Sequence, residues 1–243
     1  MAIDDRIGKI RGILDEQDDD VLAALVPLGA IFAPILSVCA TAKSILDAKE
    51  CRARIVAALR ALCDELQSMQ KSLPGNAESA LKSIWFRRAL QALIEESMRA
   101  ASEEYAATLA RAVAHGCFPD DENKHRQEDL ASYIEDIARL GADDIQMLKL
   151  LRDAYATAIR NAPQMDNPNI FANEYDGYVR RAGELKIHPD DRIALGARLC
   201  GFGLAYESPT QPFPGQHFVR PTRRGLYLLS LLDAAETPSN KRN

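Results

Sequence analysis

The sequence predicts a mainly α-helical protein, in which a bundle of long helices with an apolar first helix precedes a small α+β unit. Three observations support this fold class. Residues 21–42 form an uncharged apolar run, and residues 35–73 and 78–115 contain neither proline nor glycine. Short apolar runs separated by proline and glycine between residues 201 and 222 are typical of a strand pair. Helices therefore dominate, and strands are expected only near the C-terminus.

The domain boundary is predicted from a change in pattern after the long helices. Residues 161–169 (NAPQMDNPN) have the composition of a linker, so the boundary lies there or just before the helix that begins at Asp143. We take the second of these places for the division. The chain then comprises a helical bundle over 1–142, an α+β unit over 143–235 and a flexible tail over 236–243.

The apolar run at residues 21–42 has two interpretations. It holds 22 residues without a charge, which is long enough to span a bilayer. Its strongly apolar side chains favour insertion by about −3 to −6 kcal/mol, whereas a proline such as Pro27 or Pro34 costs on the order of 3 kcal/mol in an aqueous helix. Because these terms nearly cancel, the run is either a membrane helix or a helix buried in a soluble bundle or oligomer. The sequence slightly favours the buried helix.

Small side chains recur along one face of this predicted helix. Such a face lets two helix backbones approach closely and predicts self-association. The acidic residues before the run and the basic residues after it would place the rest of the chain in the cytoplasm if the helix inserts. The residues expected to line the membrane or oligomer contact are Gly29, Ala30, Ala33, Ser37, Ala40 and Ser44.

Composition argues against several classes of function. The net charge is −5, so the whole chain lacks the basic character of a nucleic-acid-binding protein. The five cysteines never form a C-x-x-C pair, which disfavours structural zinc and a disulfide framework and suits the reducing cytoplasm. Four scattered histidines, with no glycine-rich phosphate loop and no nucleophile motif, predict no catalytic residue, cofactor or metal.

The polar loop 119–126 has two interpretations, a metal site and a solvated loop. It holds Asp120, Asp121 and His125 and follows His115 closely, and these residue types can ligate a metal ion. Nothing in their spacing fixes a ligand geometry. A solvated loop is the favoured interpretation.

Apolar residues at spacings of three and four indicate how the bundle helices pack. The first long helix carries them as Ile55, Leu59, Leu62, Leu66, Met69 and Leu73. This pattern predicts packing against the next helix, with dimerisation as the alternative. The next helix is expected to run from residue 78 to a stop at Gly116, with Trp85 as a core anchor. Two further helices are predicted over 127–140 and 143–161.

The C-terminal unit resembles a winged helix-turn-helix domain. A helix is predicted over 171–186, and a second opens at His188-Pro189-Asp190-Asp191 and ends at Gly201 and Gly203. Strands are expected over 204–206 and 217–220, before a closing helix capped by Thr222. The residues that carry the resemblance are Leu199, Gly203, Leu204, Thr222, Gly225 and Leu228. The resemblance implies a fold shared by DNA-binding and protein-binding domains.

Charge favours the protein-binding interpretation over DNA binding. In a winged helix, the helix that begins at Pro189 would enter the major groove through its N-terminal residues. Those residues are Asp190 and Asp191, which the phosphate backbone repels. A small basic patch partly compensates, so DNA binding stays an alternative. The residues predicted to contact a partner or nucleic acid are Arg192, Arg198, Arg220, Arg223 and Arg224.

The order of the parts also resembles the abortive-infection alpha-type proteins of bacterial phage defence. The matching stretches are Pro27–Pro34, Arg54–Leu66, Glu103-Glu104-Tyr105-Ala106 with Leu109-Ala110, and the helix pair from Leu130 to Leu151. This resemblance implies a role in antiviral defence, often through membrane association. Together with the apolar run, the cysteines and the C-terminal unit, it leads us to expect a non-enzymatic protein in the cytoplasm, with association at the inner membrane as an alternative, that forms homo-oligomers and can bind a protein partner. The resemblance carries no catalytic residues over to this chain.

Overall fold

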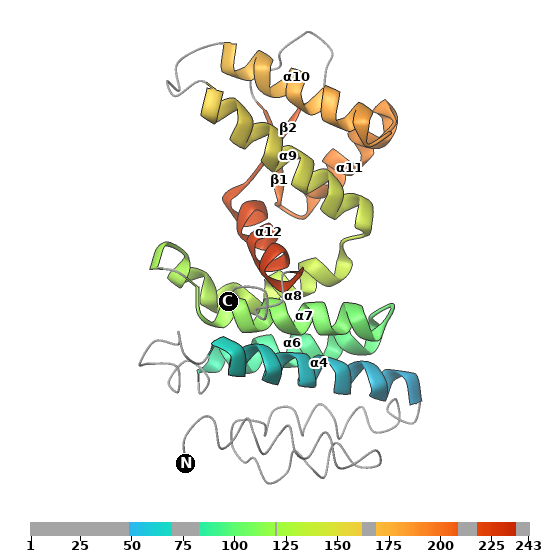
Figure 1. Ribbon diagram of the computed structural model, residues 1–243, viewed down its shortest axis with the longest axis vertical. Coiled ribbons are helices and arrows are strands. Elements are labelled where there is room, and N and C mark those ends of the chain that lie inside the picture. Colours follow the sequence, from blue (N-terminus) through green and yellow to red (C-terminus); the bar gives the residue numbers. More distant parts are fainter. Residues whose placement is uncertain (1–48, 70–82, 120, 162–168, 209–217, 237–243) are drawn as a thin grey trace. The chain divides into compact units, whose positions relative to one another are not determined.

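The computed structural model describes residues 49–69, 83–119, 121–161, 169–208 and 218–236 (Figure 1). Within these residues the protein is mainly helical, with eight α-helices, one 3-10 helix and a two-stranded sheet. The apolar segment 21–42 and the six small residues from Gly29 to Ser44 lie outside the described residues. Of the predicted tail 236–243, Glu236 is the last residue of a helix, and residues 237–243 lie outside the described residues. The mainly α-helical class predicted from the sequence is confirmed.

The chain divides into two compact units. The first unit comprises Met1–Arg139 together with Leu231–Asn243, and the second unit comprises Leu140–Ser230. The division thus falls close to the predicted boundary at residue 143. The two divisions differ near the C-terminus. The C-terminal domain is predicted to extend to residue 235, whereas residues from Leu231 onward are grouped with the first unit.

The described part of the first unit is built from helices. They are α4 (Lys49–Met69), α6 (Ile84–Arg99), α7 (Glu103–Cys117), the 3-10 helix η3 (Asp121–Asp129) and α8 (Leu130–Arg139). Helix α4 packs against α6 and α7, and α6 also packs against α8. The four predicted seam residues Ile55, Leu59, Leu62 and Leu66 are at most 5% exposed. Packing of this seam within the chain, which the sequence favoured over dimerisation, is therefore confirmed for these residues.

The predicted single helix from residue 78 to residue 115 is wrong, because the described part of this stretch, from residue 83 onward, is divided between α6 and α7. Helix α6 ends at Arg99, and Ser102 adopts an extended conformation (φ −154°, ψ 165°) as the N-cap of α7. The Ser102 hydroxyl accepts a hydrogen bond from the backbone N–H of Tyr105 at 3.1 Å. From α4, Arg54 Nη1 donates to the backbone oxygens of Met98 at 3.2 Å and Ala100 at 2.5 Å. A serine cap and an arginine from another helix thus make this break without proline or glycine.

Two other predictions for the first unit are corrected. Gly116 does not stop α7, which continues to Cys117. Instead, a Cβ at this position would lie 2.3 Å from Leu130 Cδ1, so glycine lets the buried Leu130 side chain pack closely on α7. Trp85 is only partly buried, whereas its neighbour Phe86 is 3% exposed and occupies the core.

The described part of the second unit contains three helices, a strand pair and the beginning of a fourth helix. These elements are α9 (Ala142–Asn161), α10 (Asn169–Glu184), α11 (Pro189–Gly201), β1 (Ala205–Glu207), β2 (Val219–Pro221) and α12 (Arg223–Glu236). The strands are antiparallel, with Tyr206 opposite Arg220. Helix α9 packs against α10, α11 and β2, and α11 also contacts β1.

Local signals place the ends of the helices in the second unit. Pro189 is the first residue of α11 and His188 is its N-cap. Gly203, with φ +68°, ends the turn that follows, in a conformation that favours glycine. The Thr222 hydroxyl accepts a hydrogen bond from the N–H of Gly225 at 3.0 Å and so caps α12. The predicted caps and strands are therefore confirmed, with small shifts in their ends.

Candidate interaction surface on α11

Helix α11 is fixed to the second unit by one face. Gly196 and Leu199 are its buried residues, and a Cβ at Gly196 would lie 3.2 Å from Val219 Cγ2 of β2. The missing side chain therefore allows α11 to lie close to the sheet. The opposite face is left open, and it is the face that a winged-helix protein would present to its target.

The open face of α11 mixes charged, small and apolar side chains. Asp190 and Asp191 lie in its first turn and Arg198 in its last turn, and all three are exposed. Between them Ile193 is 51% exposed and is one of four large apolar side chains that are exposed among the described residues. The exposed alanines Ala194 and Ala197 leave little bulk beside it. This face is therefore suited to contact with another protein surface.

Arg198, one of the five predicted contact residues, is held by a buried carboxylate. Its Nη2 atom forms an ion pair with Oδ2 of Asp144, whose side chain is fully buried, while the Arg198 side chain is 54% exposed. Asp144 Oδ2 also accepts a hydrogen bond from the N–H of Gly141 at 2.8 Å, at the start of α9. Asp144 thus orients Arg198 while leaving part of its guanidinium accessible.

Arg220 departs from the prediction that it is a contact residue. The residue is 9% exposed, and its Nε lies 3.2 Å from Oε1 of Glu174 in α10, while its Nη2 pairs with Oε2. Burial raises the pKa of Glu174 above its usual value, and the hydrogen bonds and positive charge of Arg220 act in the opposite direction. Arg220 therefore links β2 to α10 inside the second unit, and it is removed from the predicted basic patch.

The other three predicted arginines have different environments. Arg192 is partly buried, with its guanidinium carbon 6.0 Å from the centre of the Tyr178 ring. Burial raises the pKa of Tyr178 to about 12, although the nearby charge of Arg192 opposes this shift. Arg223 is exposed and Arg224 is partly buried at the start of α12. The five arginines thus do not form one uniformly exposed basic surface.

A hollow of about 300 Å³ lies beside α11. It is bordered by α9, the turn between α10 and α11, and α11 itself. In that turn Lys186 adopts φ +56°, which is uncommon for a residue other than glycine. The residues lining the hollow are Asp143, Gln146, Leu185, Lys186, Ile187, Asp191, Ala194 and Leu195. Asp191 and Ala194 of the open face of α11 thus form part of one wall of this hollow, and its other walls carry both charged and apolar groups.

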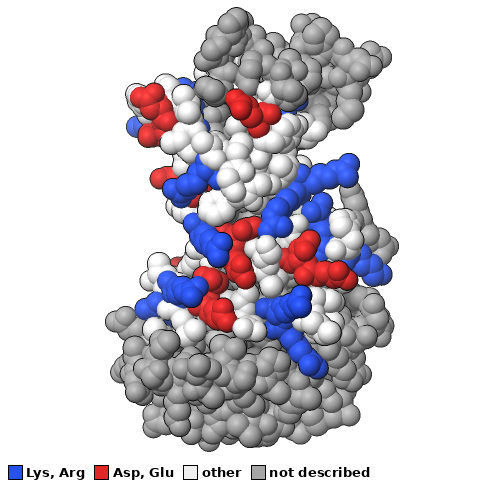
Figure 2. All heavy atoms as spheres, turned by 180° about the vertical axis from the view of Figure 1, so that it is seen from behind, with Lys and Arg blue, Asp and Glu red and all other residues white. Residues whose placement is uncertain are grey.

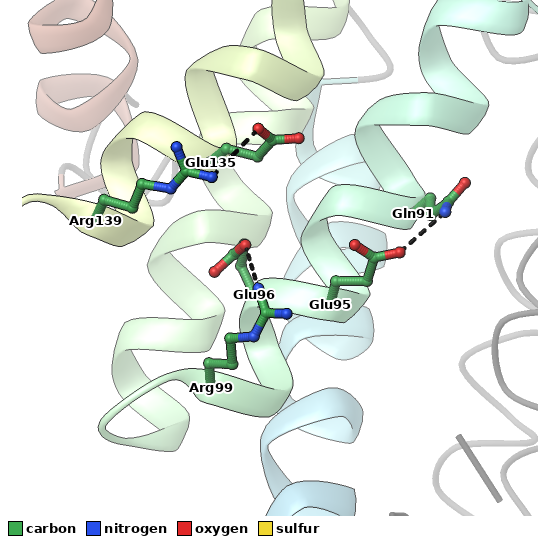
Figure 3. A network of polar contacts seen from close by, with 6 residues as sticks. All are labelled: Gln91, Glu95, Glu96, Arg99, Glu135 and Arg139. Atoms are coloured by element: carbon green, nitrogen blue, oxygen red, sulfur yellow. Dashed lines mark hydrogen bonds and ion pairs between the residues drawn. The ribbon is translucent and has the colours of Figure 1, made fainter. Parts of the chain in front are cut away.

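Charges of opposite sign are mixed on the described surface. On the face drawn in Figure 2, Lys and Arg side chains lie beside Asp and Glu side chains, without a broad area of one sign among the coloured residues. In the first unit, ion pairs and hydrogen bonds of this kind run along single helices. Figure 3 shows Gln91 with Glu95 and Glu96 with Arg99 on α6, and Glu135 with Arg139 on α8. Such pairs stabilise a helix locally by about 0.2–0.5 kcal/mol each.

One buried pair of titratable residues lies in the first unit. His115 Nε2 of α7 is 3.1 Å from Glu65 Oε1 of α4, and the two side chains are 13% and 7% exposed. The contact joins two packed helices. Among the residues that the structure describes, no group of three or more His, Cys, Asp or Glu side chains is arranged to hold a metal ion.

The predicted membrane or oligomer contact, from Gly29 to Ser44, lies outside the described residues. Of the helices that are described, none has the length and apolar character needed to cross a bilayer.

Sequence reasoning missed Glu174 and Asp144, the two buried acids that bind predicted contact arginines. They lie 46 and 54 positions from Arg220 and Arg198. No local pattern connects residues so far apart, so only the fold shows which arginine each acid binds. Ile193 belonged to the predicted helix, but its exposure is set by packing of the helix on α9 and β1.

No protein-family model, curated protein or solved structure matches the chain. The function is therefore argued from the surface of α11 and the charges around it.

Proposed function

We propose that the chain is a non-enzymatic interaction and oligomerisation protein, and that its second unit is a winged-helix-like module that contacts protein. The observation that carries this proposal is the open face of α11. It presents exposed Ile193 between acidic and basic ends, and its first turn carries Asp190 and Asp191. A DNA-reading helix would place these two carboxylates against phosphates, where they are repelled.

Burial of Arg220 is a second argument for protein binding. In a winged helix, the basic residues of the strand pair contact the DNA backbone beside the recognition helix. Here Arg220 is paired with Glu174 and is 9% exposed. Rotating it outward to reach a phosphate would leave a buried carboxylate unpaired, which costs about 3–5 kcal/mol.

The alternative is a DNA-binding regulator that uses the same unit. Exposed Arg198 and Arg223 are the observations in its favour. The two functions are separated by fluorescence anisotropy of labelled random-sequence duplex DNA, titrated with the full chain at several salt concentrations. We expect no binding at physiological salt. Binding that weakens steeply as salt increases would favour the regulator instead.

We further propose a role in bacterial phage defence, in the cytoplasm or at the inner membrane, on the basis of the resemblance to abortive-infection alpha-type proteins. A plaque assay on bacteria that express the full chain tests the defence role, and unchanged plaque numbers across a phage panel would contradict it. Carbonate washing of membranes from the same cells tests membrane association. The matched control deletes residues 21–42, the apolar run.

A further inference from the structure

The open face of α11 has opposite charges at its two ends. Asp191 lies in the first turn and Arg198 in the last turn of this 13-residue helix. They are seven positions apart, which is about two helical turns, so both lie on the same side of the helix. Exposed Ile193 and Ala194 lie in between. A surface with this order of charges is complementary to itself when it is turned end to end.

We propose that this face pairs with the same face of a second copy of the chain, with the two α11 helices antiparallel. The proposal rests on the interaction role argued above and names the partner. In a two-fold symmetric pairing every contact occurs twice. With the symmetry axis between Ala194 and Leu195, Asp191 of each copy lies level with Arg198 of the other copy.

Arg198 can bind both its own Asp144 and Asp191 of the second copy. A guanidinium carries five N–H donors, and the pair with Asp144 is formed through Nη2. The Arg198 side chain is 54% exposed, while the Asp144 side chain is fully buried. Asp144 therefore orients the guanidinium from below, and the exposed part is directed to solvent, where a carboxylate can reach it.

The apolar part of the face fits the same arrangement. In the antiparallel pair, Ile193 lies beside Ala197 of the second copy, on the flank opposite the charged pairs. The 51% exposed Ile193 side chain would lose contact with water there. Ala194 lies at the symmetry axis, where a small side chain allows the two backbones to approach.

The size of the face predicts a weak dimer. A helix of this length spans about 20 Å, and its contact is smaller than the roughly 1,200–2,000 Å² buried in standard protein interfaces. Self-association should therefore increase with protein concentration. Charge pairs at the edge of the contact should make the association weaker at high salt.

The test uses sedimentation velocity of the full chain over a wide range of concentration. The charge-reversal variants Asp191→Arg and Arg198→Glu should each lose the α11-dependent association, because each places like charges opposite one another twice. An equimolar mixture of the two variants should recover it. In the mixed pair both contacts again join opposite charges.

Two further variants keep the test decisive if Arg198→Glu disturbs folding by unpairing Asp144. Ala194→Arg places a long charged side chain at the symmetry axis and leaves the Arg198–Asp144 pair in place. It should abolish the association. Asp176→Arg reverses an exposed acid on α10 in the same unit and should leave the association unchanged. Circular dichroism checks that each variant is folded.

The outcomes separate this inference from the proposed function. A wild-type protein that stays monomeric at every concentration, or an association that survives both Ala194→Arg and the two charge reversals, overturns the pairing. If the same samples also fail to bind duplex DNA, the interaction role stands with another partner. If wild type binds DNA in a salt-dependent manner and stays monomeric at every concentration, both proposals are overturned.

Discussion

Long-range contacts of arginine side chains have different targets in the two units. In the first unit, uncharged or basic side chains bind backbone oxygens at helix ends. Arg54 binds Met98 and Ala100, Tyr105 Oη donates to Ile137 O at 2.7 Å, and Gln127 Nε2 donates to Cys117 O at 2.7 Å. In the second unit, Arg198 and Arg220 bind the carboxylates of Asp144 and Glu174. The buried Glu65–His115 contact in the first unit is the closest parallel to these charged pairs.

This difference explains which residues are available for binding. A side chain that caps a helix end replaces water at a backbone carbonyl, and its loss costs about one hydrogen bond. A buried ion pair is different, because removing one partner leaves a charge without compensation. In the second unit, the pair with Glu174 therefore keeps Arg220 in the interior. The open face of α11 remains exposed to solvent and available for binding.

The largest predicted effect is at Glu174. The substitution Glu174→Ala should lower the free energy of unfolding of the second unit by about 3–5 kcal/mol, because Arg220 is left buried and unpaired. Urea denaturation followed by far-ultraviolet circular dichroism measures the loss. The protein has one tryptophan, Trp85 in the first unit, and its fluorescence transition should change less.

The control for this substitution is Glu184→Ala on the same helix. Glu184 is 57% exposed and pairs with Arg180 at 4.0 Å, so its loss should cost less than about 0.5 kcal/mol. Equal effects of the two substitutions would contradict the distinction between interior and surface charges.

Two glycines provide a smaller, matched comparison. A Cβ at Gly225 would lie 2.2 Å from the backbone oxygen of Leu204 in the second unit, and backbone cannot easily move away. Gly225→Ala should therefore destabilise by about 1–3 kcal/mol. At Gly116 in the first unit the close atom is the end of the Leu130 side chain. Gly116→Ala should be nearly neutral, since the gain in helix propensity of about 1 kcal/mol offsets the adjustment.

Thermal denaturation of both glycine variants checks this order. A Gly116→Ala variant that melts below Gly225→Ala would show that Leu130 cannot move, and that the first unit is the more tightly packed of the two.

A smaller effect than those of Glu174→Ala and Gly225→Ala is predicted at Tyr105. Tyr105→Phe removes the hydrogen bond to Ile137 O and keeps the ring, so the first unit should lose about 0.5–1.5 kcal/mol. Trp85 fluorescence during urea denaturation measures the change. A loss as large as that of Glu174→Ala would mean that helix-end contacts are as important to the first unit as buried charges are to the second.

Local signals account for what the sequence predicted correctly. Pro189 after His188, Gly203 after α11 and Thr222 before α12 each act within one turn of their own position, so the pattern alone places them. The α4 seam was also predictable, because burial on a helix follows its period. The break before α7 lies in a stretch without proline or glycine, and its local signal is Ser102 followed by two acids, a helix-start pattern.

The parts that could not be predicted depend on contacts between distant residues. Whether Arg220 faces solvent or Glu174 is decided by the packing of β2 and α10, which are 46 positions apart at this contact. Charge and the expected fold alone place the five arginines in one group. Only the structure separates Arg220, which is buried, from Arg198, which is half exposed.

The most direct test of the account is a double-mutant cycle on Glu174 and Arg220. The free energy of unfolding is measured for wild type, Glu174→Ala, Arg220→Ala and the double variant. We predict a coupling free energy of about 2–3 kcal/mol, near the upper end for contacting residues, with both single variants strongly destabilised. A coupling near zero, with Arg220→Ala as stable as wild type, would contradict the account and return Arg220 to the surface as a binding residue.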